Sequence, residues 1–431
     1  MIRITQLKLS INHTPEELNQ KIRKELRLKN EGFTYEIVKQ SLDCRRKEDK
    51  KFVYTVDLSL QDKNQESKIL QKVHNNNIMS TGGKDQFYFA PMEGITGYLF
   101  RNEFHRQFDT NHEITKYFGP FVAATREGLT KSRDQKDVDP QNNQGIMLVP
   151  QLLGNSGEYA IPYLEKFEEL GYGEVNLYIG CPYGTVVSKK KGAGLLAQTE
   201  LLKNYLEAIF AWKDRTGSTL SISVKTRSGM NRHEEWEELL EIYNEYPLSE
   251  LILHPRIGTD LYANHPQTQD FAYAVSHSKH TLCYNGDLFT KEDFGEMKQL
   301  FPENTRWMFG RGLLVNPSLL REIQGGPAIS REEFLNYQDN ITNNYVNQKW
   351  GDKTVLFKMK ELWNYWQYLF KSQDRESGNS VEENTREPEY YLKKIRKAQR
   401  VSEYECAVWE LVGSCEITTE NGFGRRGYRM K

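Results

Sequence analysis

The sequence lacks three features that would place a protein in a common class. Its five cysteines lie far apart and form no CxxC pair, which argues against a disulfide framework and against a zinc site. Its net charge is only −1, so any nucleic-acid binding must come from local clusters of basic residues. It contains no apolar run of membrane-spanning length, and its N-terminus has no signal-peptide core. We therefore expect a cytoplasmic protein that contacts no membrane.

At 431 residues the chain is long enough for two or three domains. Residues 1–78 are predicted to form a small α+β unit of ferredoxin-like type, with strands over 2–9, 33–42 and 51–60 and helices starting at Thr14 and spanning 66–73. This segment resembles the small N-terminal domain of bacterial FAD-dependent dehydrogenases, and it offers no obvious catalytic residue. Residues 79–83 look like the start of an independent chain, which leaves a natural fusion open.

Residues 85–325 alternate between strands and helices, the pattern of a parallel α/β architecture. The predicted strands are 86–90, 113–118, 145–151, 173–178, 219–225, 249–254, 280–284 and 305–309. Eight such units over about 235 residues match the size of a (β/α)8 TIM barrel. A doubly wound sheet is the alternative, but it usually carries a glycine-rich fingerprint after its first strand, and Ala90-Pro91-Met92-Glu93-Gly94 is not one.

Polar residues stand where these strands end. They are Pro91-Met92, Gln151, Asn176, Lys225-Thr226-Arg227, His254-Pro255-Arg256, Asn285-Gly286-Asp287 and Gly310-Arg311-Gly312. In a closed barrel all strand ends point to one face, where the active sites of this fold lie. Alone, Lys225 could be a surface lysine and His254 a hydrogen-bonded core histidine. Their shared position in successive units instead favours a single site.

The last two strand ends indicate what that site binds. Barrels commonly hold a phosphate on glycine N–H groups after strands seven and eight, where Asn285-Gly286-Asp287 and Gly310-Arg311-Gly312 lie. Arg311 could add a charge-assisted contact to the phosphate. With the polar residues of the other strands lining the centre, this pattern favours a phosphorylated planar cofactor, and FMN fits best.

The stretch from Glu174 to Leu196 carries the candidate catalytic group. A strand with alternating apolar residues ends at Gly180-Cys181-Pro182, which presents a cysteine at the mouth of the barrel. Three lysines follow in the next loop, with Lys190 at their centre, where a polyanion could bind. A structural cysteine beside a solvated loop is the alternative interpretation.

Together these motifs resemble the tRNA-dihydrouridine synthase family. The matching segments are Ala90-Pro91-Met92-Glu93-Gly94-Ile95-Thr96, Phe100-Arg101, Pro150-Gln151-Leu152, Gly180-Cys181-Pro182, Val224-Lys225-Thr226-Arg227, His254-Pro255-Arg256, Asn285-Gly286-Asp287 and Gly310-Arg311-Gly312. The resemblance implies FMN-dependent reduction of uridine in RNA, with NADPH recharging the flavin. It implies that FMN is held by Pro91, Met92, Gln151, Lys225, His254, Asn285, Gly286, Asp287, Gly310 and Arg311. It also implies that Cys181 is the general acid and that Arg227 and Arg256 lie near the substrate.

The chemistry suits these residue types. When a hydride reaches C6 of the uracil, negative charge develops on C5 and O4, and a proton must reach C5 from the opposite face. A thiol with a pKa of about 8.5 is mostly protonated at neutral pH, so Cys181 can donate that proton. Lys225 near the flavin would favour its anionic reduced form. The target base has to leave the RNA stack, which costs least for an unpaired loop uridine.

Two positions depart from the family pattern. The family usually carries an asparagine three residues before the cysteine, and here that position is Tyr178. Tyr178 could stack on the substrate base or hydrogen-bond to it, whereas Asn176, at a neighbouring position, does not obviously substitute. Glu93 stands where alanine is commoner, which adds a carboxylate to the predicted cofactor loop.

Residues 326–431 are predicted to be helical, with helices over 331–348, 354–370, 388–399 and 402–412. A helical bundle after the barrel matches the family's RNA-binding domain, so the expected partner is RNA, above all tRNA. Basic residues that could follow phosphates are Lys393, Lys394, Arg396, Lys397, Arg400 and, in the tail, Arg425, Arg426, Arg429 and Lys431. We expect a monomer.

Two other functions stay open at this point. A flavin-binding barrel could reduce a small molecule such as an enone or a dihydropyrimidine, although the lysine loop and the basic tail argue against it. A non-catalytic RNA-binding protein could have kept the barrel and lost turnover, and Tyr178 is the feature that supports this alternative. Flavin absorbance of the purified protein, and the dihydrouridine content of RNA from a deletion strain, would separate the three.

Overall fold

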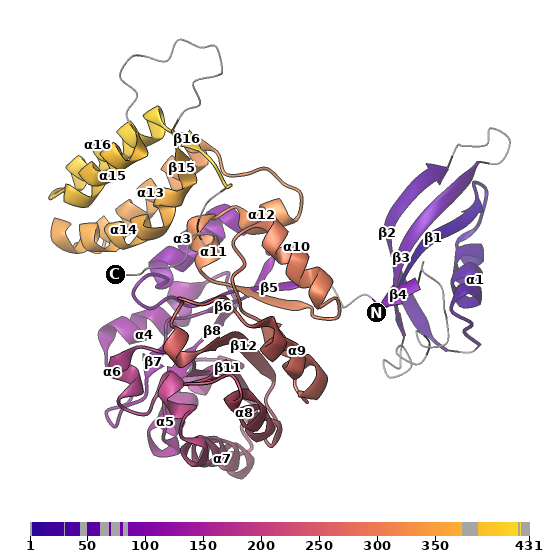
Figure 1. The fold of residues 1–431 in the computed structure, drawn as a ribbon, viewed down its shortest axis with the longest axis horizontal. Helices are drawn as coiled ribbons and strands as arrows, with labels where there is room; N and C mark the ends of the chain where they lie inside the picture. Colours follow the sequence, from indigo (N-terminus) through magenta and orange to yellow (C-terminus); the bar gives the residue numbers. More distant parts are fainter. Residues whose placement is uncertain are drawn as a thin grey trace. The chain divides into compact units, whose positions relative to one another are not determined.

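The computed structural model describes residues 2–29, 31–43, 50–60, 69, 78–80, 85–372, 387–420 and 423. The chain divides into two compact units (Figure 1). One comprises Met1–Asp85 with Lys298–Thr305, and the other comprises Gln86–Met297 with Arg306–Lys431. Among the described helices, none is long and apolar enough to cross a membrane. The domain boundary near residue 325 and the cytoplasmic location stay predictions.

The N-terminal unit is an antiparallel sheet with a helix packed on it. Strands β1 (Ile2–Ser10), β2 (Phe33–Asp43), β3 (Lys51–Leu60) and β4 (Ile78–Ser80) pair in the order β2-β3-β1-β4. Helix α1 (Pro15–Glu25) begins at Thr14, whose side chain accepts from the Glu17 N–H while the Glu17 carboxylate accepts from the Thr14 N–H. Alternate strand residues such as Ile4 and Val56 share one buried cluster with Leu18 of the helix. The predicted helix over 66–73 lies outside the described residues, apart from Ile69.

The second unit is built on a sheet of ten strands whose pairings are all parallel. The strands are β5 (Gln86–Phe89), β6 (Ile114–Phe118), β7 (Val122–Ala123), β8 (Leu148–Val149), β9 (Gln151–Leu153), β10 (Glu174–Ile179), β11 (Ser221–Gly229), β12 (Glu250–Ile257), β13 (Leu282–Tyr284) and β14 (Arg306–Phe309).

This sheet closes into a ring, and two of its strands are interrupted. Pro120 lies between β6 and β7, and Pro150 lies between β8 and β9. Proline has no N–H for the ladder, so each strand continues past it as a second short piece. β6 pairs with β5 and β8, β7 pairs with β9, and β9 also pairs with β10. When β6 and β7 are counted as one strand, and β8 and β9 as another, the ten pieces make eight strands. The predicted (β/α)8 barrel is confirmed.

The barrel interior holds a core to which Tyr88, Phe118, Ile252, Cys283 and Met308 contribute. Parallel strands buried on both faces appear in a sequence as nearly continuous apolar runs, which is why their positions could be predicted. The helices that follow the strands are α3 (Tyr98–Phe108), α4 (Ser132–Val138), α5 (Gly157–Glu169), α6 (Gly184–Val187), α7 (Thr199–Thr216), α8 (Glu235–Asn244), α9 (Thr268–His277), α10 (Lys291–Leu300), α11 (Arg311–Val315) and α12 (Leu319–Ile323). Figure 1 shows α5, α7, α8 and α9 on the outside of the strands.

Four C-terminal helices lie close to their predicted positions. They are α13 (Arg331–Val346), α14 (Asp352–Trp366), α15 (Pro388–Lys397) and α16 (Val401–Ser414), and β15 (Phe370–Lys371) pairs with β16 (Glu416–Ile417). A buried chain of hydrogen bonds joins three of the helices: Trp363 Nε1 donates to Tyr404 Oη at 2.9 Å, and Tyr404 Oη donates to Gln338 Oε1 at 3.0 Å. The basic residues predicted in the tail, from Arg425 onward, lie outside the described residues.

Candidate active site

The predicted site residues lie around the carboxyl-end mouth of the barrel. They are Pro91, Met92 and Glu93 after β5, Gln151 on β9, Tyr178, Cys181 and Lys190 on β10 and its loop, Lys225 and Arg227 on β11, His254 and Arg256 on β12, Asn285, Gly286 and Asp287 after β13, and Gly310 and Arg311 where β14 meets α11. Contacts between neighbouring strands bring most of these residues together, and the side chain of Lys190 is exposed.

A chain of amides fixes Gln151 in the wall of the barrel. Gln151 Nε2 donates to Asn176 Oδ1 at 2.9 Å, Asn176 Nδ2 donates to Ser223 Oγ at 2.9 Å, and Ser223 Oγ donates to Glu174 Oε1 at 2.7 Å. Gln151 Oε1 is buried and has no hydrogen-bond partner within the part of the chain that the structure describes. Because a buried acceptor without a donor is costly, this oxygen is suited to an N–H group of a ligand. Asn176 is occupied in holding Gln151.

Lys225 is a buried ammonium whose surroundings oppose its charge. Burial, reinforced by the positive charge of Arg227, lowers the pKa of Lys225 to about 7. Its Nζ lies 5.5 Å from the centroid of the Tyr178 ring, and among the described residues it has no hydrogen-bond acceptor. An anionic ligand at the mouth would supply the missing negative charge.

His254 is a neutral imidazole with a defined tautomer. Its Nδ1 donates to the carbonyl oxygen of Asn285 at 2.6 Å, and its Nε2 accepts from Arg256 Nη1 at 3.3 Å. Burial, with the positive charges of Arg227 and Arg256, lowers the pKa of His254 well below its ordinary value. The ring therefore offers a fixed polar surface and no charge.

Asp287 joins the two arginines at the corner predicted to hold phosphate. Its carboxylate accepts from both terminal nitrogens of Arg256, one of them at 2.9 Å, and from Arg311 Nη2 at 2.7 Å. Arg256 Nε also donates to the Asn264 carbonyl oxygen. The buried Arg256 is thus engaged by acceptors of the protein itself.

Arg227 is similarly engaged and connects two loops. Its Nε donates to the carbonyl oxygen of Gly180 at 3.0 Å, its Nη1 to that of Ile257 at 2.8 Å, and its Nη2 to that of Leu261 at 2.9 Å. The guanidinium therefore fixes the backbone beside Cys181 to the loop that follows β12.

Cys181 lies buried at the end of β10, with 3% of its surface exposed. Burial raises the pKa of the Cys181 thiol, against the opposing effect of the Tyr183 N–H and of Arg227. Gly192 packs directly on this residue: a Cβ there would lie 2.8 Å from Cys181 Cβ, and its φ of +56° favours glycine. The Ala193 N–H donates to the Cys181 carbonyl oxygen at 2.9 Å. The thiol is protonated at neutral pH and held in place.

The three lysines that follow have different roles. Lys191 Nζ turns inward and donates to the carbonyl oxygen of Ala124 at 2.7 Å. Asn155 Nδ2 donates to the carbonyl oxygens of Lys189 at 3.0 Å and Lys190 at 3.1 Å, which fixes the loop backbone. The side chains of Lys189 and Lys190 are exposed, so they are the ones that can meet a polyanion.

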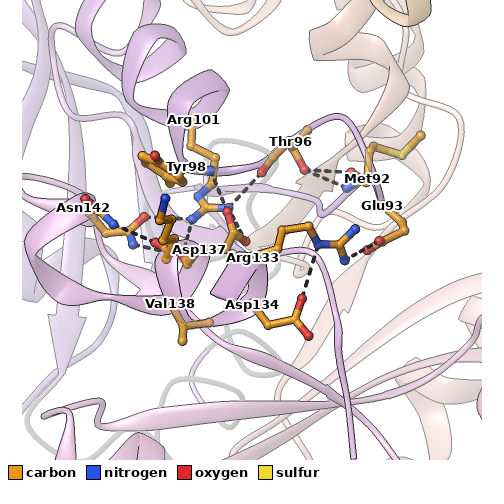
Figure 2. A network of polar contacts seen from close by, with 12 residues as sticks. Met92, Glu93, Thr96, Tyr98, Arg101, Arg133, Asp134, Asp137, Val138 and Asn142 are labelled. Atoms are coloured by element: carbon orange, nitrogen blue, oxygen red, sulfur yellow. Dashed lines mark hydrogen bonds and ion pairs between the residues drawn. The ribbon is translucent and has the colours of Figure 1, made fainter. Parts of the chain in front are cut away.

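The loop between β5 and α3 is held by a polar network (Figure 2). Met92 N–H donates to Thr96 Oγ1 at 2.8 Å, and the buried Arg101 donates to the Thr96 carbonyl oxygen at 2.8 Å and forms an ion pair with Asp137 at 3.2 Å. Glu93 leaves this loop outward and pairs with Arg133 at 2.7 Å. The predicted cofactor loop is therefore rigid on the side where it meets α4.

Sequence reasoning missed Tyr262, which lies among the arginines of the mouth. Its ring centroid lies 4.1 Å from Arg311 Cζ, 5.6 Å from Arg227 Cζ and 5.9 Å from Arg256 Cζ. The available signal was an aromatic residue shortly after the His254-Pro255-Arg256 strand end. Phe121, whose ring lies 5.9 Å from that of Tyr178, was also missed and offered no comparable signal.

The mouth fits the predicted phosphorylated planar cofactor. Gln151 Oε1 supplies an acceptor without a donor, and Lys225 supplies a cation without an acceptor among the described residues. At Gly286 a Cβ would lie 2.1 Å from Tyr284 Oη, and at Gly312 one would lie 2.0 Å from the Leu288 carbonyl oxygen. Each of the two turns of the predicted phosphate corner thus has one position, 286 or 312, at which a side chain does not fit and glycine is required.

Comparison with known proteins gives the same family. Residues 1–59 match a family model described as a domain of unknown function, so the resemblance to FAD-dependent dehydrogenases stays a prediction. A probable tRNA-dihydrouridine synthase of Staphylococcus aureus is 22% identical over 236 residues, 54% of this chain and 69% of that protein. A tRNA-dihydrouridine(16) synthase of Shigella flexneri is 26% identical over 294 residues, 66% of this chain and 89% of that protein.

Among solved structures, morphinone reductase in complex with tetrahydroNAD is similar over 57% of this chain and 88% of its own, with a TM-score of 0.39 and 10% identity. A likeness at that level carries no argument, and the barrel is established by the strand pairing. The decisive match is to the family model described as Dihydrouridine synthase, which covers residues 88–400 and so most of the chain. The chain belongs to the dihydrouridine synthase family.

Proposed function

We propose that this protein reduces uridine in tRNA to 5,6-dihydrouridine, with FMN as its bound cofactor and NADPH as the source of electrons. The observation that carries the proposal is the protonated, buried thiol of Cys181 at the same barrel mouth as the unpartnered Gln151 Oε1 and the Lys225 ammonium. Family membership and the names of the relatives support it.

The residues proposed to hold FMN form two groups, one for the ring and one for the phosphate. Gln151 and Lys225 would meet the polar edge of the ring, with Pro91, Met92 and the neutral His254 lining its surroundings. The phosphate would lie on the turns of Asn285, Gly286, Asp287, Gly310 and Arg311. The chemistry that reduced FMN would supply when held there is a hydride for C6 of the uracil.

Cys181 supplies the second hydrogen. Its S–H bond breaks as a C–H bond forms at C5, so the base gains a hydride and a proton and the enzyme is left with a thiolate. Arg227 and Lys225 stabilise that thiolate, because each lowers the pKa of Cys181. Solvent water then returns a proton to the sulfur, and the residue is ready for another turnover.

Substrate contacts are proposed for the residues that the protein leaves available. Tyr178, packed on Phe121 at 5.9 Å, would provide an aromatic surface for the base, and Lys190 would meet the RNA backbone. The side chains of Arg227 and Arg256 are taken by carbonyl and carboxylate groups. We therefore assign both arginines to shaping the mouth through the loops that they hold.

A groove on α15 and α16 is proposed as a further RNA contact. It is lined by Tyr390, Lys393, Lys394, Lys397 and Ser402, among others. Lys394 and Arg396 are already paired with Glu410 and Glu389 on the same surface, so Lys393 and Lys397 are the stronger candidates to meet phosphates.

The test uses purified full-length protein and tRNA transcribed in vitro, which carries no dihydrouridine. We expect a yellow protein that forms dihydrouridine at one or a few positions when NADPH is supplied, and tRNA from a deletion strain that lacks it at those positions. A yellow protein that oxidises NADPH with an enone but leaves all tRNA unchanged would instead identify a small-molecule reductase. A colourless protein that binds tRNA and cannot be loaded with FMN would identify a non-catalytic RNA-binding protein.

A further inference from the structure

A second group of chemically active side chains lies away from the barrel mouth, where α3 ends and β6 begins. It consists of His105 in the last turn of α3, Asp109 at its C-cap and His112 in the turn that follows. One nitrogen or oxygen atom from each residue lies within 4.8 Å of those of the other two. His105 Nδ1 is 2.9 Å from Asp109 Oδ2, and the two imidazole rings are 5.3 Å apart.

The Asp109 carboxylate is oriented before any ligand arrives. Its Oδ1 accepts from the N–H groups of Glu113 at 2.7 Å and Ile114 at 3.0 Å, and its Oδ2 accepts from Tyr117 Oη at 2.9 Å. Partners of this kind are what fixes a metal-ligating carboxylate in place. Asp109 Oδ2 is thereby directed toward His105 with little freedom to turn away.

His112 has an unusual backbone that places its ring beside His105. Its φ is +53°, in the left-handed region that costs non-glycine residues energy. Its side chain is exposed, and within the described part of the chain the imidazole makes no hydrogen bond. Its ring contacts that of His105. The strained backbone of His112 is therefore not explained by a hydrogen bond of its imidazole within the described part of the chain.

We propose that His105, Asp109 and His112 bind a divalent cation of the Zn²⁺ type, with water as the fourth ligand. Two imidazole nitrogens and a carboxylate oxygen form a common donor set for zinc, with bonds of about 2.0–2.2 Å. In a tetrahedral shell such donors lie about 3.3 Å apart, close to the His105–Asp109 distance of 2.9 Å. To complete the shell, the His112 imidazole has to move closer to the other two ligands. Its side chain is exposed and can turn inward. The cysteine spacing argued against a zinc site built on cysteines, and the site proposed here contains none.

The site has a structural role, because it lies at the amino end of the barrel strands, opposite the end where catalysis takes place. Ile114 is the first residue of β6, and Asp109 contacts its N–H, so the cluster stands at the amino end of that strand. Active sites of this fold lie at the opposite, carboxyl end. The bound cation would join the end of α3 to the start of β6 and stabilise that turn against opening.

The experiment uses full-length protein treated with a chelator and then titrated with ZnCl₂ or CoCl₂. We expect saturable binding by calorimetry, a rise in melting temperature with metal concentration, and a visible Co²⁺ spectrum of a four-coordinate ion. The informative variant is His112→Gly, because glycine adopts the left-handed φ without strain and the metal-free protein should stay at least as stable. Its affinity for Zn²⁺ should fall at least about tenfold.

His277→Ala is the matched control, since it removes another exposed imidazole outside the cluster and should leave binding unchanged. Chelation should also leave dihydrouridine formation unaffected, which separates this proposal from the proposed function. Two results would overturn it: no saturable binding to the unaltered protein, or equal binding and equal thermal stabilisation in His112→Gly.

Discussion

Lys225, proposed to contact FMN, should make cofactor binding depend on pH. Its pKa in the folded protein is lowered to about 7, so between about pH 7 and 10 the unfolded chain holds a proton that the folded chain has released. The free energy of unfolding should therefore rise with pH over that window. An anionic cofactor favours the charged ammonium, so FMN should bind with uptake of a proton and its affinity should fall as pH rises above 7.

Titration calorimetry in buffers of different ionisation enthalpy measures that proton uptake directly. Lys225→Met should remove both the uptake and the pH dependence, whereas Lys189→Met, at an exposed position, should change neither. An unaltered protein whose FMN affinity is constant from pH 6 to pH 9 would contradict the assignment of Lys225.

Cys181 predicts a reaction rate that falls only at a pH above the range in which Lys225 titrates. Burial raises the pKa of its thiol, so the acid form persists through neutral pH and is lost only on the alkaline side, above the ordinary thiol range of about 8.5. Dihydrouridine formation should be flat with pH near neutrality and fall in base. Cys181→Ala should lower the rate by at least about 100-fold without changing FMN affinity, and Cys406→Ala, at an exposed cysteine of α16, should leave both unchanged.

For single residues, the sequence predicted which side chains lie at the mouth better than it predicted their hydrogen-bond partners. Gln151, Lys225 and His254 lie on barrel strands and Cys181 lies just after one, so their place at the mouth followed from the predicted barrel. The hydrogen-bond partners of Arg227 and Arg256 could not be predicted, because they include carbonyl groups in loops whose paths no local pattern specifies, and the substrate contact expected of both arginines stays a prediction. Tyr262 was missed for the same reason.

Among the elements, the loop between β5 and α3 depends on the buried pair of Arg101 and Asp137 (Figure 2). Asp137 also accepts from the Tyr98 N–H at 2.6 Å, so it fixes the start of α3. Asp137→Asn leaves a buried guanidinium without its charge partner and should lower the free energy of unfolding by about 3 kcal/mol. FMN affinity should fall about tenfold, because Met92 and Thr96 lose their support. Chemical denaturation and flavin fluorescence measure the two effects.

Arg133→Gln is the matched control for that variant. The side chain of Arg133 is 69% exposed, so its ion pair with Glu93 is screened by solvent and should contribute less than about 1 kcal/mol. If the two variants lost equal stability, the buried network would not be what holds the loop.

The strands themselves were predictable and their interruptions were not. The alternation of strands and helices located all eight, but β8 and β9 were expected as one strand, and Pro150 divides them. β11 and β12 run on to Gly229 and Ile257, beyond their predicted ends, because Arg227 and Arg256 remain in the ladder despite their charge. A sequence pattern treats a charged residue as the end of a buried strand, whereas here carbonyl and carboxylate partners compensate the burial.

For the whole molecule, the barrel and the C-terminal helices belong to one compact unit and are joined by hydrogen bonds. Lys358 of α14 donates to the Gly94 carbonyl oxygen at 2.5 Å, and Tyr98 Oη donates to Gln348 Oε1 at 3.3 Å. The predicted cofactor loop is therefore supported from the barrel by Arg101 and from the helical part by Lys358. RNA bound to the helices would act on the same loop that lines the mouth.

The N-terminal unit, by contrast, should be dispensable for the reaction. Every residue proposed for FMN or substrate lies at or beyond Pro91, and the N-terminal unit has a buried cluster of its own, with Ile2, Val56 and Ile78 among its members. A chain of residues 85–431 keeps Asp85 and its ion pair with Lys298 at 2.7 Å. It should fold, bind FMN with unchanged affinity and modify the same uridines of transcribed tRNA at a rate within about threefold of the full chain, because the groups that set the barrier are all retained. Loss of FMN binding or of site selection in this shortened chain would show that the N-terminal unit takes part in the reaction.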